Sequence, residues 1–592
     1  MKQYGTISLP RALAPAIEVA LRGFAIPKQF PRAERFKAFT SSRELYFDEN
    51  LEPPAVGSVF RNPDLARTYQ LIVRDGVDAF YRGPIARAIV DTIQHPPLAE
   101  DASEYVNAAA MRPGKMELSD LADYRQPAIS PTHVQYRGYD VYSSPPPSSG
   151  GSTVGEALNI LEGFDLSGPD RTLAQHRFIE AAKLAYADRA RYIGDPEFVD
   201  VPLDELLSQD YADERRCLIG EHAMQAPVAA GDATPPYDTS CSGSELGQEE
   251  GEHEGSTAHL SVVDRWGNTV SLTSTNVSSS AVVVPGYGFL LNNEMTNFNP
   301  KPLFEGDPNL TEGGKRPRGN MAPTVVVRDG QPVLSVGVAG GQTIQTTVLN
   351  ILINHLDFGM GLPEALSAGR ASQRNTATTL VDPDFRCRYG DELTARFGHR
   401  FSGPSVPSFA QGVSILPDGH LVAVADPRGV GYEAGVVTPT EFVGDSPESC
   451  LAESVRDQMA ANGVVVDKAI DNTDQVVSYD GDWQEYAVSR AYGGSWHTGF
   501  TADGLVEIPF TGTRARYFAT KGPRSGRGDV YVDGEYQTTV DFYEPSQTIR
   551  LMVFDTGELD PGNHTIRVEV TGTGNPEADL KVITFDALGI NN

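Results

Sequence analysis

The first 235 residues carry their apolar positions mainly at helical spacing. Apolar residues recur every three or four positions in the segments 66–93 and 176–194, which predicts amphipathic helices there. Between these segments, residues 136–142 alternate between apolar and polar positions, as a strand does. The strand runs into PPPSSGGS at 145–152, which predicts a rigid turn before another helix over 154–161. A polar segment rich in Gly, Ser and Glu then follows at 231–255, and it predicts a surface loop.

After residue 256 the period of the pattern changes from helical to two. Residues 259–263 and 269–275 alternate around Asp264-Arg265-Trp266-Gly267-Asn268, which indicates a hairpin. Further strands are predicted at 324–327 and 333–338, and an apolar helix over 343–359. Strands packed under helices imply a layered domain of the α/β or α+β class.

From about residue 470 the chain contains only short strands separated by turn residues, at the spacing typical of a β-sandwich. The pattern therefore predicts four parts. Residues 1–256 are mainly helical, 257–436 mix strands and helices, 437–468 form a connector with a helix, and 469–592 form an all-β sandwich domain.

Composition and charge remove several classes of function. Acidic residues exceed basic ones and give the 592-residue chain a formal charge of −31, which argues against binding to a nucleic-acid backbone. No apolar run is long enough to cross a bilayer, and the first residues lack the layout of a signal peptide. Cys217, Cys241, Cys387 and Cys450 do not have metal-ligand spacing, so we expect no metal site. Cys217 and Cys241 could pair in an exported protein, but their spacing alone does not establish a bond.

Thr257 is the residue with the most suggestive context. A threonine hydroxyl is a weak nucleophile unless a base lies beside it, and a threonine freed at a new N-terminus can use its own α-amine. Such a design needs a loop that ends abruptly at Ser or Thr and is followed at once by a strand. Gly255-Ser256-Thr257-Ala258-His259 fits this requirement. Taken alone, the pattern fits an ordinary strand residue better.

Longer motifs change that interpretation. The sequences STAHLSVVDRWGNTVSLTSTN, GFLLNNEMTNF, KRPRGNMAPTVVV and GVAGGQ follow one another between residues 256 and 342. Upstream lie YGTISL, YRGYDVYSSPPPSSGG and YADRARYIGDPEFVDVP, and downstream lies ADPR at 425–428. In order and spacing these motifs resemble the gamma-glutamyltransferase family of N-terminal-nucleophile (Ntn) hydrolases, over roughly residues 3–436.

The resemblance implies an α+β fold, the four-layer αββα Ntn-hydrolase sandwich, and a set of catalytic roles. Thr257 matches the autoprocessing and catalytic threonine, with cleavage between Ser256 and Thr257. Thr275 matches the threonine that supports the nucleophile. Gly340 and Gly341 match the pair whose N–H groups form the oxyanion hole, where side chains would prevent close approach.

The substrate-binding positions depart from the family pattern. Glu294 matches the residue that holds the substrate's α-amino group, but Asn297 stands where the family typically has Asp. Gly319-Asn320 replaces the usual Ser-Ser pair that holds the α-carboxylate. The family's substrate-binding Asn falls on Val277 by strict spacing, with Asn276 one place earlier.

The family resemblance implies acyl transfer from a small γ-glutamyl compound such as glutathione, through an acyl-Thr257 intermediate, to water or an amino acid or peptide. It implies no cofactor, and an extracellular or periplasmic location. Family members carry a segment before the residues matching Tyr4-Gly5-Thr6, so we expect a sandwich incomplete at its N-terminus, and either a separate polypeptide that supplies this segment or a start codon assigned too late. An acylase-like amidohydrolase with another acyl group stays open, as does a catalytically degenerate extracellular glycan-binding or scaffold protein.

Three further features have a simpler structural explanation. His259 shares the face of Thr257 on an alternating strand, and we expect a hydrogen-bonded structural histidine. His176 and Glu180 lie one helical turn apart without an evident third ligand, so we expect no metal there. Aromatic residues of the C-terminal part make a glycan a candidate partner, although buried strand aromatics are their commoner role: Trp483, Trp496, Tyr517 and Tyr531.

Overall fold

The structure is a computed structural model. It describes nearly all of the region up to residue 428 and much of the region from 450 onward. The described ranges are 5–26, 34–107, 111–126, 128–237, 257–403, 406–428, residues 450, 455–456, 458–459, 466, 468–471, 477–480, 483–487, 495–499, 504–573 and 582–591. Ser256, Cys241, most of the predicted connector and the side chains of Trp483 and Trp496 lie outside the described residues.

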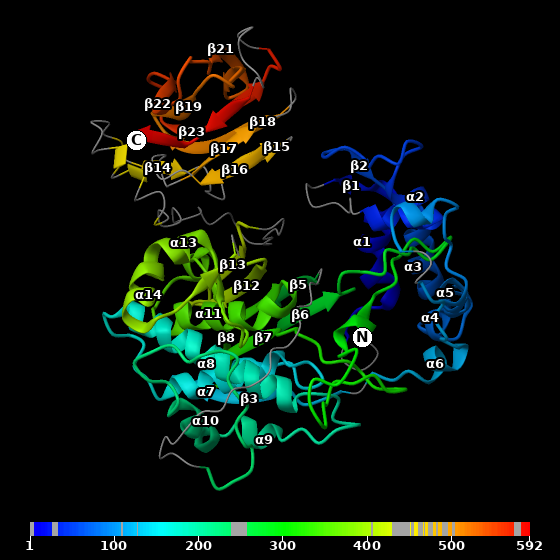
Figure 1. The fold of residues 1–592 in the computed structure, drawn as a ribbon. Helices are drawn as coiled ribbons and strands as arrows, with labels where there is room; N and C mark the ends of the chain where they lie inside the picture. The colour runs from blue at the N-terminus through cyan, green and yellow to red at the C-terminus, as the bar shows by residue number, and fades with distance from the viewer. Residues whose placement is uncertain are drawn as a thin grey trace.

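A six-stranded antiparallel sheet organises the first 428 residues (Figure 1). Its strand order is β13-β12-β8-β7-β4-β3, so segments from both halves of this region share one sheet. The strands are β3 (Thr132–Tyr136), β4 (Tyr139–Ser143), β7 (Thr324–Arg328), β8 (Gln331–Ala339), β12 (Phe409–Ile415) and β13 (Leu421–Ala425).

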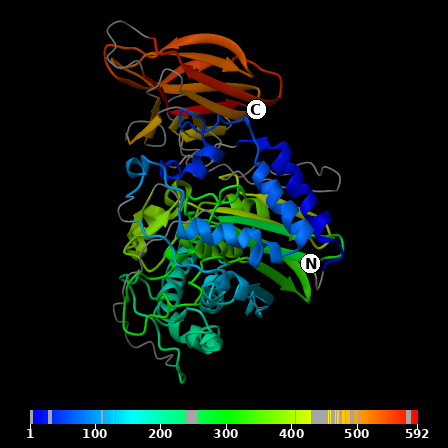
Figure 2. The same cartoon turned by 90° about the vertical axis from the view of Figure 1, so that its right-hand side faces the viewer.

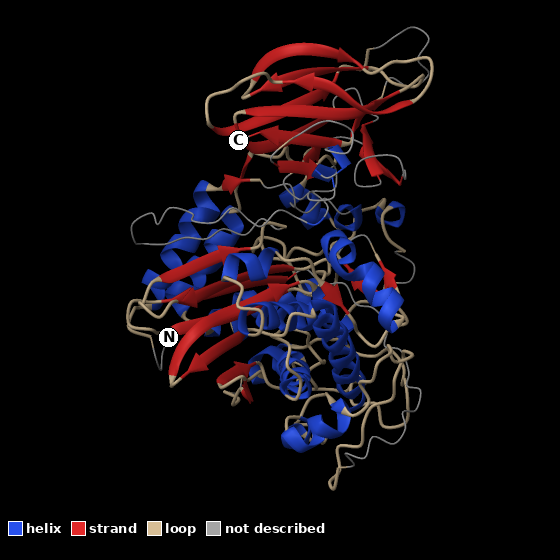
Figure 3. Ribbon diagram, turned by 90° about the vertical axis from the view of Figure 1, so that its left-hand side faces the viewer, coloured by secondary structure: helices blue, strands red, loops and turns tan. Residues whose placement is uncertain are grey.

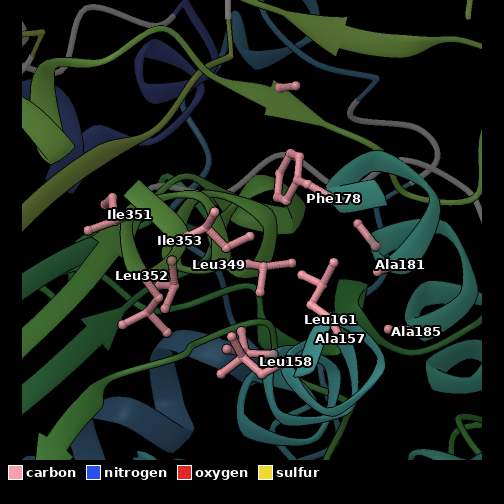
Figure 4. Close-up of a cluster of buried hydrophobic side chains, with 14 of the residues drawn as sticks. Ala157, Leu158, Leu161, Phe178, Ala181, Ala185, Leu349, Ile351, Leu352 and Ile353 are labelled. Atoms are coloured by element: carbon pink, nitrogen blue, oxygen red, sulfur yellow. The ribbon is translucent and has the colours of Figure 1, made fainter. Parts of the chain in front are cut away.

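The helices α7 (Gly150–Glu162) and α11 (Ile344–Leu356) pack on one face of this sheet, and the buried helix α8 (Arg171–Tyr192) packs against α7. In α7 and α11 nearly every residue is buried, as expected for helices that are packed on all sides. Figure 4 shows part of the core that they share, in which Leu158 and Leu161 of α7, Phe178 of α8 and Leu349 of α11 are labelled.

The predicted hairpin packs on the opposite face of the sheet. It consists of β5 (Thr257–Val263) and β6 (Thr269–Thr275), paired from Thr257↔Thr275 to Val263↔Thr269. Its inner face is polar: Ser335 Oγ of the sheet donates to Ser261 Oγ at 2.9 Å, and Ser271 Oγ donates to the Val336 carbonyl at 3.1 Å.

The outer face of the β5–β6 hairpin is apolar and exposed to solvent. Leu260, Val262, Val270 and Leu272 alternate with the inward-facing polar residues, and each side chain is 45–54% exposed. Because successive side chains of a strand point to opposite faces, every second residue of the hairpin lies on its outer face. An apolar face of this kind on a two-stranded sheet is normally covered by another layer.

A group of helices formed by residues 9–123 lies at one side of the sheet, shown in blue in Figure 1 and facing the viewer in Figure 2. It contacts the segment after β6: Ser41 Oγ donates to the Val283 carbonyl and Ser42 Oγ to the Ala281 carbonyl, both at 2.7 Å. The group comprises α1 (Leu9–Arg22), α2 (Thr40–Tyr46), α3 (Pro63–Asp75), α4 (Asp78–Tyr81), α5 (Pro84–Gln94), α6 (Leu118–Asp123) and the strand pair β1 (Phe24–Ala25) and β2 (Val59–Phe60).

Smaller elements complete the described part of this region. They are α9 (Leu203–Leu206), α10 (Gln209–Arg216), α12 (Leu362–Ser367), α13 (Pro383–Phe385), α14 (Asp391–Phe397) and a small sheet of β9 (Ala371–Ser372), β10 (Thr379–Val381) and β11 (Phe401–Ser402). Mixed helices and sheets agree with the class expected from the sequence. None of the described helices is both long and apolar enough to span a bilayer.

After residue 466 the described residues are almost entirely strands (Figure 3). Two main sheets, β14-β25-β19-β22 and β15-β18-β23-β20-β21, share one apolar core that includes Val506, Tyr517, Val568 and Leu588. The strands are β14 (Lys468–Asp471), β15 (Ser478–Asp480), β16 (Trp483–Ala487), β17 (Ser495–Gly499), β18 (Leu505–Gly512), β19 (Arg514–Lys521), β20 (Arg527–Val532), β21 (Glu535–Asp541), β22 (Thr548–Asp555), β23 (Gly562–Val570), β24 (Ile583–Phe585) and β25 (Ala587–Asn591).

A disulfide joins Cys387 to Cys450 and so links the mixed region to the chain that precedes the strands. The Cys450 N–H also donates to the Asp384 carboxylate at 2.6 Å. Beyond this bond, Val455, Met459 and Val466 pack on Phe518 and Ala587 of the strand-rich part. Cys217 is disulfide-bonded as well.

Candidate active site

Thr257 and Thr275 face each other at one end of the β5–β6 hairpin. They are directly paired in the ladder, and the Thr257 hydroxyl donates to Thr275 Oγ1 at 3.2 Å. A hydroxyl that donates a hydrogen bond places electron density on its oxygen and holds it in one direction. The pair thus has the geometry of a nucleophile with a supporting hydroxyl.

The chain reverses sharply after Thr275. The Val277 N–H donates to Thr275 Oγ1 at 2.8 Å, and Val277 adopts the left-handed conformation with φ 57°. A positive φ costs conformational energy at a β-branched residue, and such strained residues are found most often at functional sites. The turn brings the Val277 side chain to the site, whereas Asn276 is not among the residues that line it.

Gly340 and Gly341 lie between β8 and α11. Their φ angles are 154° and 59°, and a Cβ on Gly340 would come within 2.6 Å of the Pro407 carbonyl oxygen. The pair opens the short helix Gly341–Thr343 and then α11, and such a start directs backbone N–H groups outward. Gly341 lines the site, and Gly340 is its neighbour on the β8 side.

These segments surround a hollow with about 340 Å³ of empty volume. The hollow is lined by Thr257, Thr275, Val277, Glu294, Asn297, Gly319, Asn320, Met321, Gly341 and Ile344. Six of the eight site residues predicted from the sequence therefore lie together here, and the exceptions are Gly340 and Asn276.

Glu294 and Asn297 form one polar wall of the hollow. Both belong to a single 3-10 turn, Glu294–Asn297, so the Asn297 Nδ2 reaches back to donate to Glu294 Oε1 at 2.8 Å. The Asn297 carbonyl accepts from Asn309 Nδ2 at 2.8 Å, which fixes the turn. Burial raises the pKa of Glu294 above its usual value, and the bond from Asn297 opposes this effect.

Gly319 and Asn320 form a second polar wall. The proline-rich turn before α7 holds them, since the Ser149 N–H donates to the Gly319 carbonyl at 2.9 Å and the Gly319 N–H donates to the Pro147 carbonyl at 3.1 Å. Asn320 Oδ1 accepts from Arg189 Nη2 at 2.6 Å.

Val277, Met321 and Ile344 provide the apolar part of the lining. Sequence reasoning placed Val277 at a family binding position but did not single out Met321 or Ile344. Met321 follows Asn320 in the sequence, and Ile344 lies close after Gly341. The predicted site residues therefore indicated that Met321 and Ile344 also lie near the site.

The His259 side chain lies on the inner face of the hairpin and does not take part in the Thr257–Thr275 pair. Its ring nitrogens bond to Thr273 Oγ1 and Ser261 Oγ, each at 2.9 Å. The ring covers Gly337, where an added Cβ would lie 2.2 Å from it. Burial lowers the pKa of His259 to about 4, so the ring is neutral at physiological pH. This geometry is that of a structural histidine.

His399, which is remote in sequence, joins His176 and Glu180 in a buried cluster that sequence reasoning did not find. The cluster is already satisfied by hydrogen bonds. Lys183 Nζ donates to Glu180 Oε1 at 2.7 Å, and His176 bonds to His399 at 2.8 Å and to the Gly220 carbonyl at 3.0 Å. A lysine ammonium on the carboxylate opposes a second cation at the same oxygen, so we assign the cluster to the core of the fold.

Known proteins are similar to this chain over the region that contains these residues. The sequence profile of the family described as Gamma-glutamyltranspeptidase matches residues 1–436. The chain is similar to the Glutathione hydrolase proenzyme of Bacillus subtilis (strain 168), with 34% identity over 446 residues that cover 74% of this chain and 72% of the relative.

Two acylases are also similar to this chain. The Acylase ACY 1 proenzyme of Pseudomonas sp. (strain SE83) is 32% identical over 447 residues, which cover 74% of this chain and 73% of the relative. The crystal structure of a cephalosporin acylase from Bacillus halodurans matches with a TM-score of 0.57 and 28% identity, covering 71% of this chain and 73% of that one.

Proposed function

This chain belongs to the gamma-glutamyltranspeptidase family, and we propose that it transfers or hydrolyses γ-glutamyl groups with Thr257 as its nucleophile. The chain is an Ntn hydrolase, and the proenzyme names of its relatives fit maturation by self-cleavage. The observation that carries the assignment to Thr257 is its hydrogen-bonded pairing with Thr275 at a hollow with carboxylate and amide walls.

Maturation begins with attack of Thr257 Oγ1 on the Ser256 carbonyl carbon. The acyl group moves from the Thr257 nitrogen to its oxygen, and water then hydrolyses the ester. The products are a carboxylate at Ser256 and a free α-amine at Thr257. This amine is the general base of the mature enzyme.

In turnover the amine accepts the Thr257 hydroxyl proton as Oγ1 attacks the γ-carbonyl carbon of the substrate. Thr275 supports the attacking oxygen. The Gly340 and Gly341 N–H groups stabilise the oxyanion of the tetrahedral intermediate. The leaving amine takes the proton, and an acyl-Thr257 ester remains. Water or the amino group of an acceptor then attacks this ester and frees Oγ1.

The acyl preference follows from the two polar walls. A partly buried carboxylate at Glu294 suits an ammonium group, and an amide at Asn320 suits a carboxylate. A γ-glutamyl group carries both charges, whereas a glutaryl group of the same length lacks the ammonium. Glu294 is partly buried and receives a neutral hydrogen bond from Asn297, so an ammonium group would stabilise its carboxylate further, and we assign the γ-glutamyl group as the preferred donor.

An acylase-like preference is the second candidate, favoured by the apolar lining of Val277, Met321 and Ile344 and by the two similar acylases. Paired kinetics on γ-glutamyl and glutaryl 4-nitroanilides decide between the two. A kcat/KM at least tenfold higher for the γ-glutamyl compound supports the proposed function. The reverse ratio would assign the chain to the acylases. Absence of turnover on both compounds would overturn both assignments of the acyl group.

We also propose that a further polypeptide segment covers the outer face of the β5–β6 hairpin. The support is the exposed apolar row of Leu260, Val262, Val270 and Leu272. Replacement of two fully buried Leu residues costs several kcal/mol, whereas replacement of exposed ones changes stability by less than about 0.5 kcal/mol. If a Leu260→Thr/Leu272→Thr variant loses several kcal/mol in its free energy of unfolding, the face is covered in the purified protein. If it loses less than about 0.5 kcal/mol, the face is exposed there.

For the strand-rich part after residue 466, we propose an appended β-sandwich module that binds glycans. Tyr536 is 56% exposed and lies on β21, at the edge of its sheet. The centre of its ring is 5.7 Å from the centre of the Tyr531 ring. Tyr517 is buried in the core, so it is unsuited to sugar stacking. Glycan-array binding that a Tyr536→Ala variant loses would support this role, and an array without any signal would argue against it.

We propose an extracellular or periplasmic location. The support is the Cys387–Cys450 bond, since disulfides persist in oxidising compartments. Free-thiol titration of the protein recovered from its native host would detect two reactive thiols at these positions if the compartment were reducing.

A further inference from the structure

Arg189 is a buried cation directly behind the hollow. It lies near the end of α8, and its side chain is almost fully buried. Burial lowers its pKa to about 10, which leaves the guanidinium charged at neutral pH. Two of its nitrogens point toward the rim: Nη2 donates to Asn320 Oδ1 at 2.6 Å and Nε donates to Ser149 Oγ at 2.8 Å.

The guanidinium group is itself held in one orientation. Ser149 Oγ, which accepts from it, donates to the Gly319 carbonyl at 2.7 Å and accepts from Gln345 Nε2 at 2.8 Å. The guanidinium carbon also lies 5.6 Å from the centre of the Tyr186 ring. Since a guanidinium is planar with donors in fixed directions, these contacts determine where Nη2 points.

A fixed Arg189 determines which way the Asn320 amide faces. A carboxamide has one acceptor oxygen and one donor nitrogen, and arginine can only donate. The oxygen must therefore turn to Arg189, and the Nδ2 group remains for the hollow. Rotation of the amide by 180° would bring two donors together and leave the arginine without this acceptor.

We infer that Arg189 is a positioning residue: it fixes the Asn320 carboxamide so that Nδ2 donates to the α-carboxylate of the donor substrate. This inference rests on the proposed function. The opposite wall uses the same device, because the Asn297 Nδ2 is bonded to Glu294 and its Oδ1 is therefore left as an acceptor for an ammonium group. The two walls together complement a zwitterionic amino-acid head.

A double-mutant cycle separates orientation from a merely structural role. Serine at position 320 has a hydroxyl that rotates and can donate without help. Arg189→Met should raise KM for γ-glutamyl 4-nitroanilide by about tenfold or more in the parent, since a charge-assisted bond is lost, with a smaller effect on kcat. In an Asn320→Ser background the same substitution should change KM by less than about twofold. An equal loss in both backgrounds would show that Arg189 acts only through the fold.

Asn320→Asp provides a second variant that retains a partner for Arg189. Its carboxylate can still accept from the guanidinium, but it presents an acceptor instead of a donor to the hollow. Calorimetry of this variant with L-glutamate should show binding weakened by about tenfold or more. Binding of 4-aminobutyrate, which lacks the α-carboxylate, should stay within about twofold of the parent.

Equal weakening for both ligands, or none for either, would overturn the inference about Asn320. These binding measurements do not depend on turnover. If the parent binds glutamate with the expected dependence on residue 320 but cleaves neither anilide, the proposed function fails and the positioning role stands. If the parent turns over γ-glutamyl anilide without that dependence, the positioning role fails alone.

Discussion

Thr257 and Thr275 occupy directly opposed positions of an antiparallel hairpin, with their hydroxyl oxygens 3.2 Å apart. Their alignment depends on register, because a shift of one residue would turn Thr257 to the outer face of the sheet. The Asp264–Asn268 turn sets that register. Within it the Asp264 carboxylate accepts from the N–H groups of Trp266 and Asn268 at 2.9 Å.

Thr257→Ala should leave the chain uncleaved and inactive. Alanine offers no oxygen for attack on the Ser256 carbonyl or on the substrate. Denaturing electrophoresis of the parent under reducing conditions should show two pieces that meet between residues 256 and 257, and the variant should show one band. Thr257→Ser is the matched control and should still mature. Cleavage of the alanine variant at the parent's rate would assign the nucleophile elsewhere.

Thr275→Val should slow catalysis while leaving substrate binding nearly unchanged. Valine keeps the shape of threonine but cannot accept the hydrogen bond from Thr257. Loss of this neutral hydrogen bond, which holds the attacking oxygen in position, is worth roughly 0.5–1.5 kcal/mol, or about two- to tenfold in kcat. Steady-state kinetics should show this loss, with Thr275→Ser nearly as fast as the parent. A valine variant as fast as the parent would remove Thr275 from the mechanism.

Glu294→Gln should weaken binding of γ-glutamyl but not glutaryl substrates. Only the former carries an ammonium group, and loss of its charged partner should raise KM by about ten- to a hundredfold at neutral pH. The raised pKa of Glu294 adds a pH effect. Protonation neutralises the carboxylate, so KM should rise as the pH falls toward this pKa. The rise should begin at a higher pH than that at which exposed glutamates titrate. The glutamine variant should lack this rise.

Stability should fall as the pH drops below about 6.5 because buried histidines must then be protonated. Burial lowers the pKa of His259 to about 4 and that of His399 to about 3, while the unfolded chain titrates near 6.5. The unfolded state therefore binds more protons between these values, and folding loses stability progressively as the pH falls. For His259 the loss approaches about 3 kcal/mol near pH 4.

Urea unfolding between pH 7.5 and 4.5 measures this dependence. His259→Gln should flatten the curve, since glutamine can still bond to both hydroxyl groups but does not titrate in this range. His95→Gln is the matched control for the loss of an exposed histidine. An identical pH slope for the His259 variant and the parent would contradict a neutral, buried His259.

The sequence predicted the local elements near the site with good accuracy. The hairpin was expected at 259–263 and 269–275 and is found at Thr257–Val263 and Thr269–Thr275. Alternation with a period of two and an Asp-Asn turn are local signals that neighbouring residues determine. The motifs also placed Glu294, Asn320 and Gly341 together, although they come from three separate segments.

Relationships across the fold were not predictable in this way. His399 packs on His176 although 223 positions separate them, and no local pattern pairs two such residues. Arg189 belongs to a segment for which the sequence predicted only an amphipathic helix, whereas α8 is buried over most of its length. Its contact with Asn320 depends on how α8 packs beside the turn at Ser149. The conformation of Val277 was equally hidden, because a positive φ at a β-branched residue contradicts its own preference.

The disulfide between Cys387 and Cys450 gives the two parts of the molecule a second covalent connection besides the main chain. Residues 388–449 form a closed loop, so one cut by a protease anywhere in that loop leaves both ends covalently attached. The strand-rich part would then be retained on the catalytic part through sulfur instead of through the main chain. Such a nicked molecule would separate into two only on reduction. In an environment rich in proteases, the appended part is thus attached by two independent routes.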